Sequence, residues 1–251
     1  SESIERQENS EGFPILLFPS LKVIGFLSTD IENGIFIQDI IEIIHKMAKK
    51  EIEQSCSNYI ECEYKVRAEN YYKTKEEKEG RLDIFGDAEI KSFDELKSSN
   101  CKMIIDNELS PFSKKFTTEK RHKVKIYIDP DAEVLSAKNM FYNCSSLLRV
   151  DMTHFDNSKV NNMKSIFENC TSLENINLTD LDTSNVTDMS KMFAGCKYLK
   201  SLNIGKFDTR KAKKLNGIFD GCEALDEIDL PVNIETVENM MPYLNQNIDS
   251  N

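Results

Sequence analysis

The sequence predicts an α/β protein, in which a solenoid of short strand plus short helix units follows a small α+β domain. The first observation is a set of apolar and cysteine positions that recur every 26 residues, three intervals in a row. The second is a change of apolar spacing within each repeat, from alternation to a helical stripe. A fixed period of about 20 to 50 residues indicates a solenoid, because its stacked units share one continuous core.

Five columns of side chains keep this interval, and we expect them to be buried. Two columns form the structural core of the repeat: Phe141, Phe167, Phe193 and Phe219, with Cys144, Cys170, Cys196 and Cys222. The other three contain Leu147, Leu173, Leu199 and Leu225; Val150, Ile176, Leu202 and Ile228; and Met152, Leu178, Ile204 and Leu230.

Each unit combines two local patterns. A short strand is expected after Leu173, because the spacing of Ile176 and Leu178 is the apolar–polar alternation typical of a strand. A short helix is expected from the apolar stripe Val186, Met189, Met192, Phe193 and Cys196. Asn and Gly tolerate a left-handed helix end, and they precede the cysteines at Asn143, Asn169, Gly195 and Gly221. We interpret the recurring Asp156, Asp182 and Asp208 as turn-forming residues, with a calcium or catalytic role as the alternative.

Four segments are expected along the chain. Residues 1–12 form a flexible N-terminus, and residues 13–131 form an α+β N-terminal and capping domain. Residues 132–231 form the repeats, and 232–251 a C-terminal cap with a polar tail. The capping role follows because the first repeat strand otherwise exposes an open edge.

One helix and several strands are predicted before the repeats. Apolar residues at helical spacing predict an amphipathic helix over about 36–54, and the interrupted apolar stretch 14–27 predicts a pair of buried strands. Alternation predicts a strand over 62–68. Further expected elements are strands at 82–85, 102–106 and 123–129, the last two paired, and a solvated loop at 73–80.

Composition limits the classes of partner. The chain has a formal net charge of −11, with 39% apolar and 30% charged residues, which is the balance of a globular protein. Nucleic-acid backbones require clustered Lys and Arg, so we expect no nucleic-acid partner. No stretch approaches the roughly 18 apolar residues of a membrane-spanning helix, so we expect no membrane span.

The cysteines and histidines do not form a recognisable chemical motif. We expect the repeat cysteines to be packed thiols, because Cys is often buried and CxxC spacing is missing. Whether Cys56 and Cys62 form a disulfide stays open. His45, His122 and His154 have no neighbours typical of a triad or a metal site, so we expect surface roles. We therefore expect no catalytic residues, no metal and no cofactor.

The repeats resemble a known family. Segments such as LDTSNVTDMSKMFAGC, with an FDTS-like turn followed by V-x-x-M and MF-x-G-C, are similar to the BspA-type leucine-rich repeats. That 26-residue bacterial surface protein repeat also occurs in mycoplasma lipoproteins. The resemblance covers about residues 132–231, and Ala212 and Leu215 depart from its pattern. It implies a leucine-rich-repeat-like solenoid for protein binding, often at cell surfaces and in adhesion, without catalytic residues.

Function is expected on the polar face of the repeat strands. The residues between the buried positions face away from the core, and solenoids bind through such extended faces. The candidate partner-binding residues are Arg149, Asp151, Asn175, Asn177, Ser201, Asn203, Glu227 and Asp229. This polar face predicts a non-enzymatic protein-interaction protein, a surface or adhesion-type binding module. The sequence does not identify the partner or the oligomeric state.

Two alternatives remain open. The first is a cytoplasmic inhibitor or immunity-type protein that neutralises a basic partner. The second, less favoured, is an enzyme with its site in the N-terminal domain. The resemblance favours an extracellular or cell-surface location, and the lack of a visible signal peptide leaves a cytoplasmic one possible.

Overall fold

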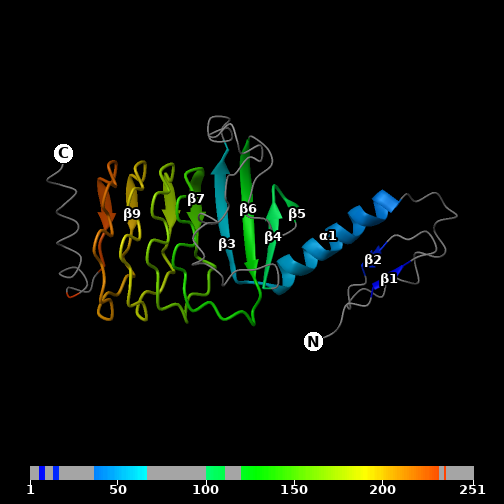
Figure 1. Cartoon of the computed structure of the whole chain (residues 1–251), viewed down its shortest axis with the longest axis horizontal. Helices are drawn as coiled ribbons and strands as arrows, with labels where there is room; N and C mark the ends of the chain where they lie inside the picture. Colours follow the sequence, from blue (N-terminus) through cyan, green and yellow to red (C-terminus); the bar gives the residue numbers. More distant parts are fainter. Residues whose placement is uncertain are drawn as a thin grey trace. The chain divides into compact units, whose positions relative to one another are not determined.

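The computed structural model describes residues 6–8, 14–16, 37–66, 100–110, 120–231 and 235, and the structural statements below concern these residues. They form a mixed α/β structure with one helix and many strands (Figure 1). In chain order the elements are β1 (Arg6–Glu8), β2 (Pro14–Leu16), α1 (Ile37–Ser55), β3 (Tyr59–Lys65), β4 (Cys101–Ile105), β5 (Glu108–Ser110), β6 (Arg121–Ile128), β7 (Leu147–Asp151), β8 (Asn175–Asn177), β9 (Ser201–Asn203) and β10 (Glu227–Asp229). The predicted loop at 73–80, the predicted strand at 82–85 and nearly all of the expected C-terminal cap lie outside the described residues.

The chain divides into two compact units, Ser1–Met47 and Ala48–Asn251. In the first, β1 and β2 pair antiparallel, so a strand occupies part of the segment expected to be a flexible N-terminus. Helix α1 begins in this unit and confirms the predicted helix to within one residue at each end. The expected boundary after residue 131 falls inside the second unit, because strands from both sides of it share one sheet.

That sheet has the strand order β5-β4-β6-β3-β7-β8. The strands from β5 to β7 pair antiparallel with their neighbours, whereas β7 and β8 are parallel. The predicted pairing of the strands near 102–106 and 123–129 is confirmed as β4 with β6. Because β3 pairs with β7, the edge of the first repeat strand is covered, as the sequence predicted.

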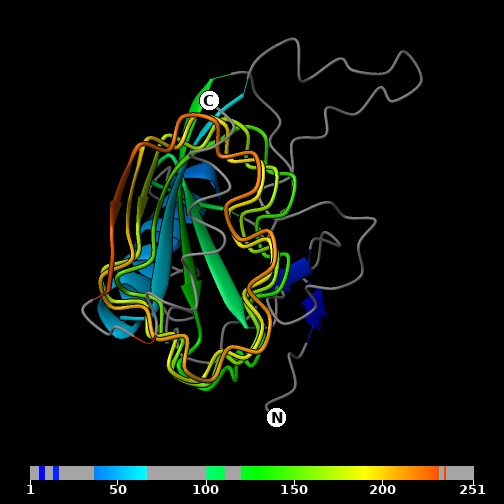
Figure 2. The ribbon, with the colours of Figure 1, turned by 90° about the vertical axis from the view of Figure 1, so that its left-hand side faces the viewer.

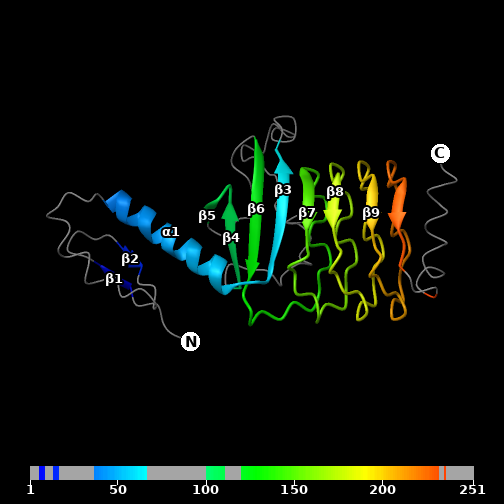
Figure 3. The same ribbon diagram turned by 180° about the vertical axis from the view of Figure 1, so that it is seen from behind.

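The repeat strands follow one another at the predicted interval of 26 residues. Arg149 of β7 lies opposite Asn175 of β8, and Ser201 of β9 lies opposite Glu227 of β10 in a separate parallel pair. Figures 1 and 3 show β7, β8, β9 and β10 side by side. Figure 2 views the molecule along the stacked repeats. The strands lie on one side of each repeat, and turn segments form the rest of it.

The predicted core columns are buried almost throughout. All members of the Phe and Cys columns have at most 3% exposure. The rings of Phe141, Phe167, Phe193 and Phe219 stack with centroids 5.6, 5.9 and 6.0 Å apart. Ile176, Leu225 and Ile228 are only partly buried, and Leu230, in the fourth unit, is exposed at 39%.

The prediction of a short helix in each unit is wrong. The segments 137–143, 163–169 and 189–195 are successive turns. Every second N–H donates to a carbonyl of the next unit, as Ala137 N does to Asn162 O at 2.9 Å, while Met140 N bonds three residues back to Ala137 O at 3.2 Å. The apolar spacing is helical, but the backbone donors are used between units rather than along a helix.

Left-handed residues explain why no helix forms. The predicted column has positive φ angles of 61°, 61°, 74° and 67° at Asn143, Asn169, Gly195 and Gly221. A second column, missed by the sequence analysis, has φ angles of 60°, 55°, 57° and 68° at Asn139, Ser165, Lys191 and Gly217. Two left-handed positions within seven residues prevent a continuous right-handed helix.

The Asp column forms turns, as predicted. The Oδ1 atoms of Asp156, Asp182 and Asp208 accept hydrogen bonds from the backbone N–H two residues later, at 3.1, 2.8 and 3.0 Å. These bonds satisfy the donors of the turn between the strand and the turn segments.

The cysteines are free thiols, including Cys56 and Cys62. Cys170 Sγ donates to Phe141 O at 3.0 Å, and the next two repeat cysteines make the same contact with the preceding unit, at 3.3 and 3.1 Å. Burial raises the pKa of these thiols, to about 12 for Cys222. They therefore stay neutral and pack as small apolar groups.

The substitution Cys170→Ser tests the packed thiol. A hydroxyl costs more to bury than a thiol, and its shorter bond leaves part of the sulfur volume unfilled, so we expect a loss of about 1 to 3 kcal/mol. Urea denaturation measures this loss, with Cys56→Ser at a partly exposed thiol as the control. An unchanged free energy of unfolding in Cys170→Ser would contradict the packed column.

Substitutions of Gly195 test the left-handed column. A Cβ at Gly195 meets Asn169 Oδ1 at 2.5 Å, but that amide can turn, and it already donates to Asn143 Oδ1 at 2.9 Å. In Gly195→Asn, the new side-chain amide lies next to those of Asn169 and Asn143 and can hydrogen-bond to Asn169. A branched side chain at positive φ is instead strained by about 1 to 3 kcal/mol. We expect Gly195→Val to melt well below Gly195→Asn, and equal melting temperatures would refute this assignment.

Candidate functional site

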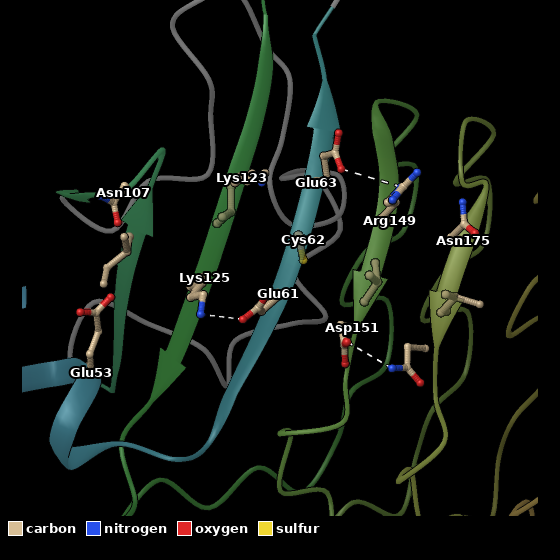
Figure 4. A pocket seen from close by; sticks show the side chains of 15 residues that line it. Glu53, Glu61, Cys62, Glu63, Asn107, Lys123, Lys125, Arg149, Asp151 and Asn175 are labelled. Atoms are coloured by element: carbon tan, nitrogen blue, oxygen red, sulfur yellow. Dashed lines mark hydrogen bonds and ion pairs between the residues drawn. The ribbon is translucent and has the colours of Figure 1, made fainter.

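The outer face of the sheet in the second unit carries a hollow of about 620 Å³ (Figure 4). Its floor is formed by β6, β3, β7 and β8, with contributions from Ile104 of β4, and Glu53 of α1 and Asn107 lie at one side. Lys49 of α1 donates to Asn107 O at 2.8 Å, which ties the end of the helix to the turn between β4 and β5.

Strand register arranges the side chains of the hollow in two rows. The Arg149 row consists of Lys123, Glu63, Arg149 and Asn175. The Asp151 row consists of Lys125, Glu61, Asp151 and Asn177. Each row crosses four strands, because residues opposite each other on paired strands point to the same face.

Charges in the Asp151 row are closely paired. Lys125 Nζ lies 2.6 Å from Glu61 Oε1. Asp151 Oδ1 accepts the N–H of Thr153 at 2.9 Å, and its Oδ2 accepts the amide of Asn177 at 3.2 Å. Burial alone would raise the pKa of Asp151, but these hydrogen bonds outweigh it and lower the pKa. The carboxylate is therefore held ionised.

The Arg149 row retains unused polar groups. Glu63 Oε1 lies 2.6 Å from Arg121 Nη1, whereas Arg149 Nε approaches Glu63 Oε2 only to 3.8 Å. Within the described part of the chain, the side chains of Lys123 and Asn175 have no hydrogen-bond or ion-pair partner. This row can offer donors to a ligand.

The structure places all eight predicted residues on one face, but gives the two columns different roles. Asp151, Asn177 and Asn203 accept hydrogen bonds from the N–H two residues later, at 2.9, 3.3 and 3.0 Å. They therefore hold the turns that follow the strands. The equivalent donor is missing after Asp229, because Pro231 has no N–H.

The other column is exposed to solvent. Arg149, Asn175, Ser201 and Glu227 are all exposed. Among the described residues, no hydrogen bond engages the side chains of Asn175, Ser201 or Glu227. Arg149 and Asn175 line the hollow, and the other two continue the column onto β9 and β10.

Sequence reasoning missed the contribution of β3 and β6 to this face. Glu61 and Glu63 alternate with buried residues in β3, as Lys123 and Lys125 do in β6. That alternation could have identified them as outward-facing. It could not reveal that β3 lies beside β7, since this pairing joins segments that are distant in the sequence.

The surface role expected for His122 is wrong. Its position in β6 alternates with exposed Arg121 and Lys123, so the ring points to the core side and is 4% exposed. His122 Nδ1 lies 2.9 Å from Asp106 Oδ2, which also pairs with Lys120 Nζ at 2.8 Å. The pair lies on the opposite face of the sheet from the hollow.

The other two histidines are exposed, as expected. The ring of His154 stacks on Tyr59 with centroids 4.4 Å apart, and His45 lies on α1. Within the residues that the structure describes, no cluster of three or more His, Cys, Asp or Glu side chains is suited to a metal ion. None of the described helices combines the length and apolar character needed to cross a membrane.

Comparison with known proteins gives one match. A family model described as "Mycoplasma protein of unknown function, DUF285" matches residues 135–251. The match begins within the first repeat and extends to the end of the sequence. No curated protein and no solved structure matches the chain.

The pH dependence of unfolding tests the hydrogen bonds of Asp151. Its folded pKa is lowered, so its stabilising effect is complete above the unfolded pKa of about 3.9 and is lost as the pH falls through the folded value. We expect Asp151→Asn to be less stable than the wild type at neutral pH, with the difference shrinking below about pH 4. Urea midpoints across this range measure the effect, and a difference independent of pH would contradict it.

Proposed function

We propose that this chain is a non-enzymatic protein-interaction protein, in which a leucine-rich-repeat-like solenoid of the BspA type presents its strand face to a protein partner. The observation that carries the proposal is the exposed column Arg149, Asn175, Ser201 and Glu227. These side chains stand on neighbouring strands with hydrogen-bonding capacity that the described part of the chain does not use. The 26-residue register of the strands supports the solenoid.

The scaffold around this column favours binding. Adjacent strands lie about 4.8 Å apart, and the turn bonds of Asp151, Asn177 and Asn203 fix the ends of the strands. A column held in this way loses little conformational freedom when a partner binds. A partner would meet a polar, hydrogen-bonding surface of the kind found around the core of transient interfaces.

The setting we propose is a surface or adhesion-type module. Its support is the resemblance of the repeats to bacterial surface repeats and the Mycoplasma description of the matching family model. The alternative is a cytoplasmic inhibitor of a basic partner, supported by the net charge of −11 and by exposed Glu227 and Asp229. An enzyme has the least support, because the buried His122–Asp106 pair faces away from the hollow.

A pull-down with matched variants tests the proposal. The strand-face variant combines Asn175→Lys, Ser201→Lys and Glu227→Lys, which leave the turn-forming residues intact. The control is Asn216→Lys, an exposed position on the turn side of the fourth unit. Both variants must retain the melting temperature of the wild type before they are compared.

We expect the wild type and the control to capture the same protein from lysate or surface fractions, and the strand-face variant to lose it. The fraction that contains the partner then identifies the compartment. A partner retained by the strand-face variant would overturn the proposal and place binding elsewhere on the chain.

A further inference from the structure

We propose that the hollow binds an extended segment of the partner protein that carries an acidic and a basic side chain two residues apart. The acidic side chain lies against the Arg149 row and the basic side chain against the Asp151 row. This inference rests on the proposed function and specifies the chemistry of the partner.

Unused positive charge lies at the Arg149 row. Three cations, Arg121, Lys123 and Arg149, surround the single carboxylate of Glu63. Arg121 satisfies that carboxylate at 2.6 Å, while Arg149 remains at 3.8 Å with 59% of its side chain exposed. Lys123 has no side-chain partner in the described part of the chain. A carboxylate from a partner would therefore meet Arg149 and the neighbouring amide of Asn175, with Lys123 adding positive charge on the far side of β3.

Unused negative charge lies at the Asp151 row. The close pair of Lys125 and Glu61 cancels two of its charges. Asp151 keeps its negative charge, because its Oδ2 accepts only the neutral amide of Asn177. Glu53, at the side of the hollow, is exposed and makes no ion pair with any described residue. Asp151 therefore favours a Lys or Arg side chain from the partner, while Glu53, across β6 and β3 from it, adds negative charge at the far side of the hollow.

Strand geometry sets the spacing of the two charges. Arg149 and Asp151 are two residues apart on one face of β7, so their Cα atoms are separated by about 7 Å. Side chains at positions i and i+2 of an extended segment have the same separation. Figure 4 shows Arg149 and Asp151 pointing to the same side of the sheet, with Glu53 at the edge of the hollow.

The charge pattern argues against a partner of one charge sign. A purely basic segment would be repelled by Arg149 and Lys123, and a purely acidic one by Asp151 and Glu53. The volume of about 620 Å³ lies within the usual range of ligand pockets. The neutral amides of Asn175 and Asn177 on β8 can bond the backbone or polar side chains of the segment.

Selection from a library of random linear peptides, displayed on phage and panned against the full chain, tests this inference. We expect the enriched peptides to share an acidic and a basic residue separated by one position. Arg149→Glu should weaken the binding of an enriched synthetic peptide by about tenfold or more. Replacing the acidic residue of that peptide with Lys should restore binding to this variant.

Asp151 provides the reciprocal test. Asp151→Asn keeps an oxygen for the turn bond, as Asn177 and Asn203 do, and should weaken binding of the charge-paired peptide. A peptide whose basic residue is replaced by Ala should bind this variant and the wild type equally. The control is Lys213→Glu, because Lys213 is exposed on the turn side and its side chain has no partner among the described residues. This control should bind as the wild type does.

Three outcomes overturn the inference: no enriched peptide, enriched peptides without the charge pair, or binding that Arg149→Glu and Asp151→Asn leave unchanged. If any of these occurs while the pull-down partner still depends on Asn175, Ser201 and Glu227, the strand face binds by other contacts and only this inference fails. If charge-paired peptides bind but the pull-down partner is independent of the face, the proposed function fails instead.

Discussion

The fold depends on backbone hydrogen bonds that run between neighbouring repeats. Alternate N–H groups of one unit donate to carbonyls 25 residues later, as Phe141 N does to Ile166 O at 2.8 Å and Phe193 N to Ile218 O at 2.9 Å. Because buried backbone groups must be paired, each unit must keep the conformation of its neighbour. Left-handed residues at fixed positions make this possible, and the side chains of successive units then form continuous columns.

The polar strand face follows from this constraint. Since the units superimpose, outward-facing residues of the strands form two columns, and the chain uses them differently. Asp151 and its equivalents bond their own backbone and shape the turns, while Arg149 and its equivalents keep their polar groups available. Ion pairs between units, such as Lys206–Asp180 at 2.6 Å, lie in solvent and add little stability. Packing and backbone bonds, rather than surface charges, therefore hold the face.

The N-terminal strands do more than cover the edge of the repeats. Because β3 pairs with β7, the rows of the repeat face extend onto β3 and β6 and acquire most of their charged residues there. Glu61, Glu63, Lys123 and Lys125 make this end of the face charged, whereas β8 and β9 carry neutral Asn and Ser. The strand face thus combines a charged hollow on the six-stranded sheet with a neutral polar surface that continues onto β9.

The sequence by itself determined the repeat period, the buried columns, helix α1, the left-handed residues before the cysteines and the outward direction of the strand-face residues. These features depend on spacing and residue type, which are local properties. The tertiary structure alone decided that the apolar stripe forms turns instead of a helix, because the backbone donors find partners in the next unit. It also decided the burial of His122 and the position of Glu63 beside Arg149, since the pairing of distant strands leaves no signal in either segment.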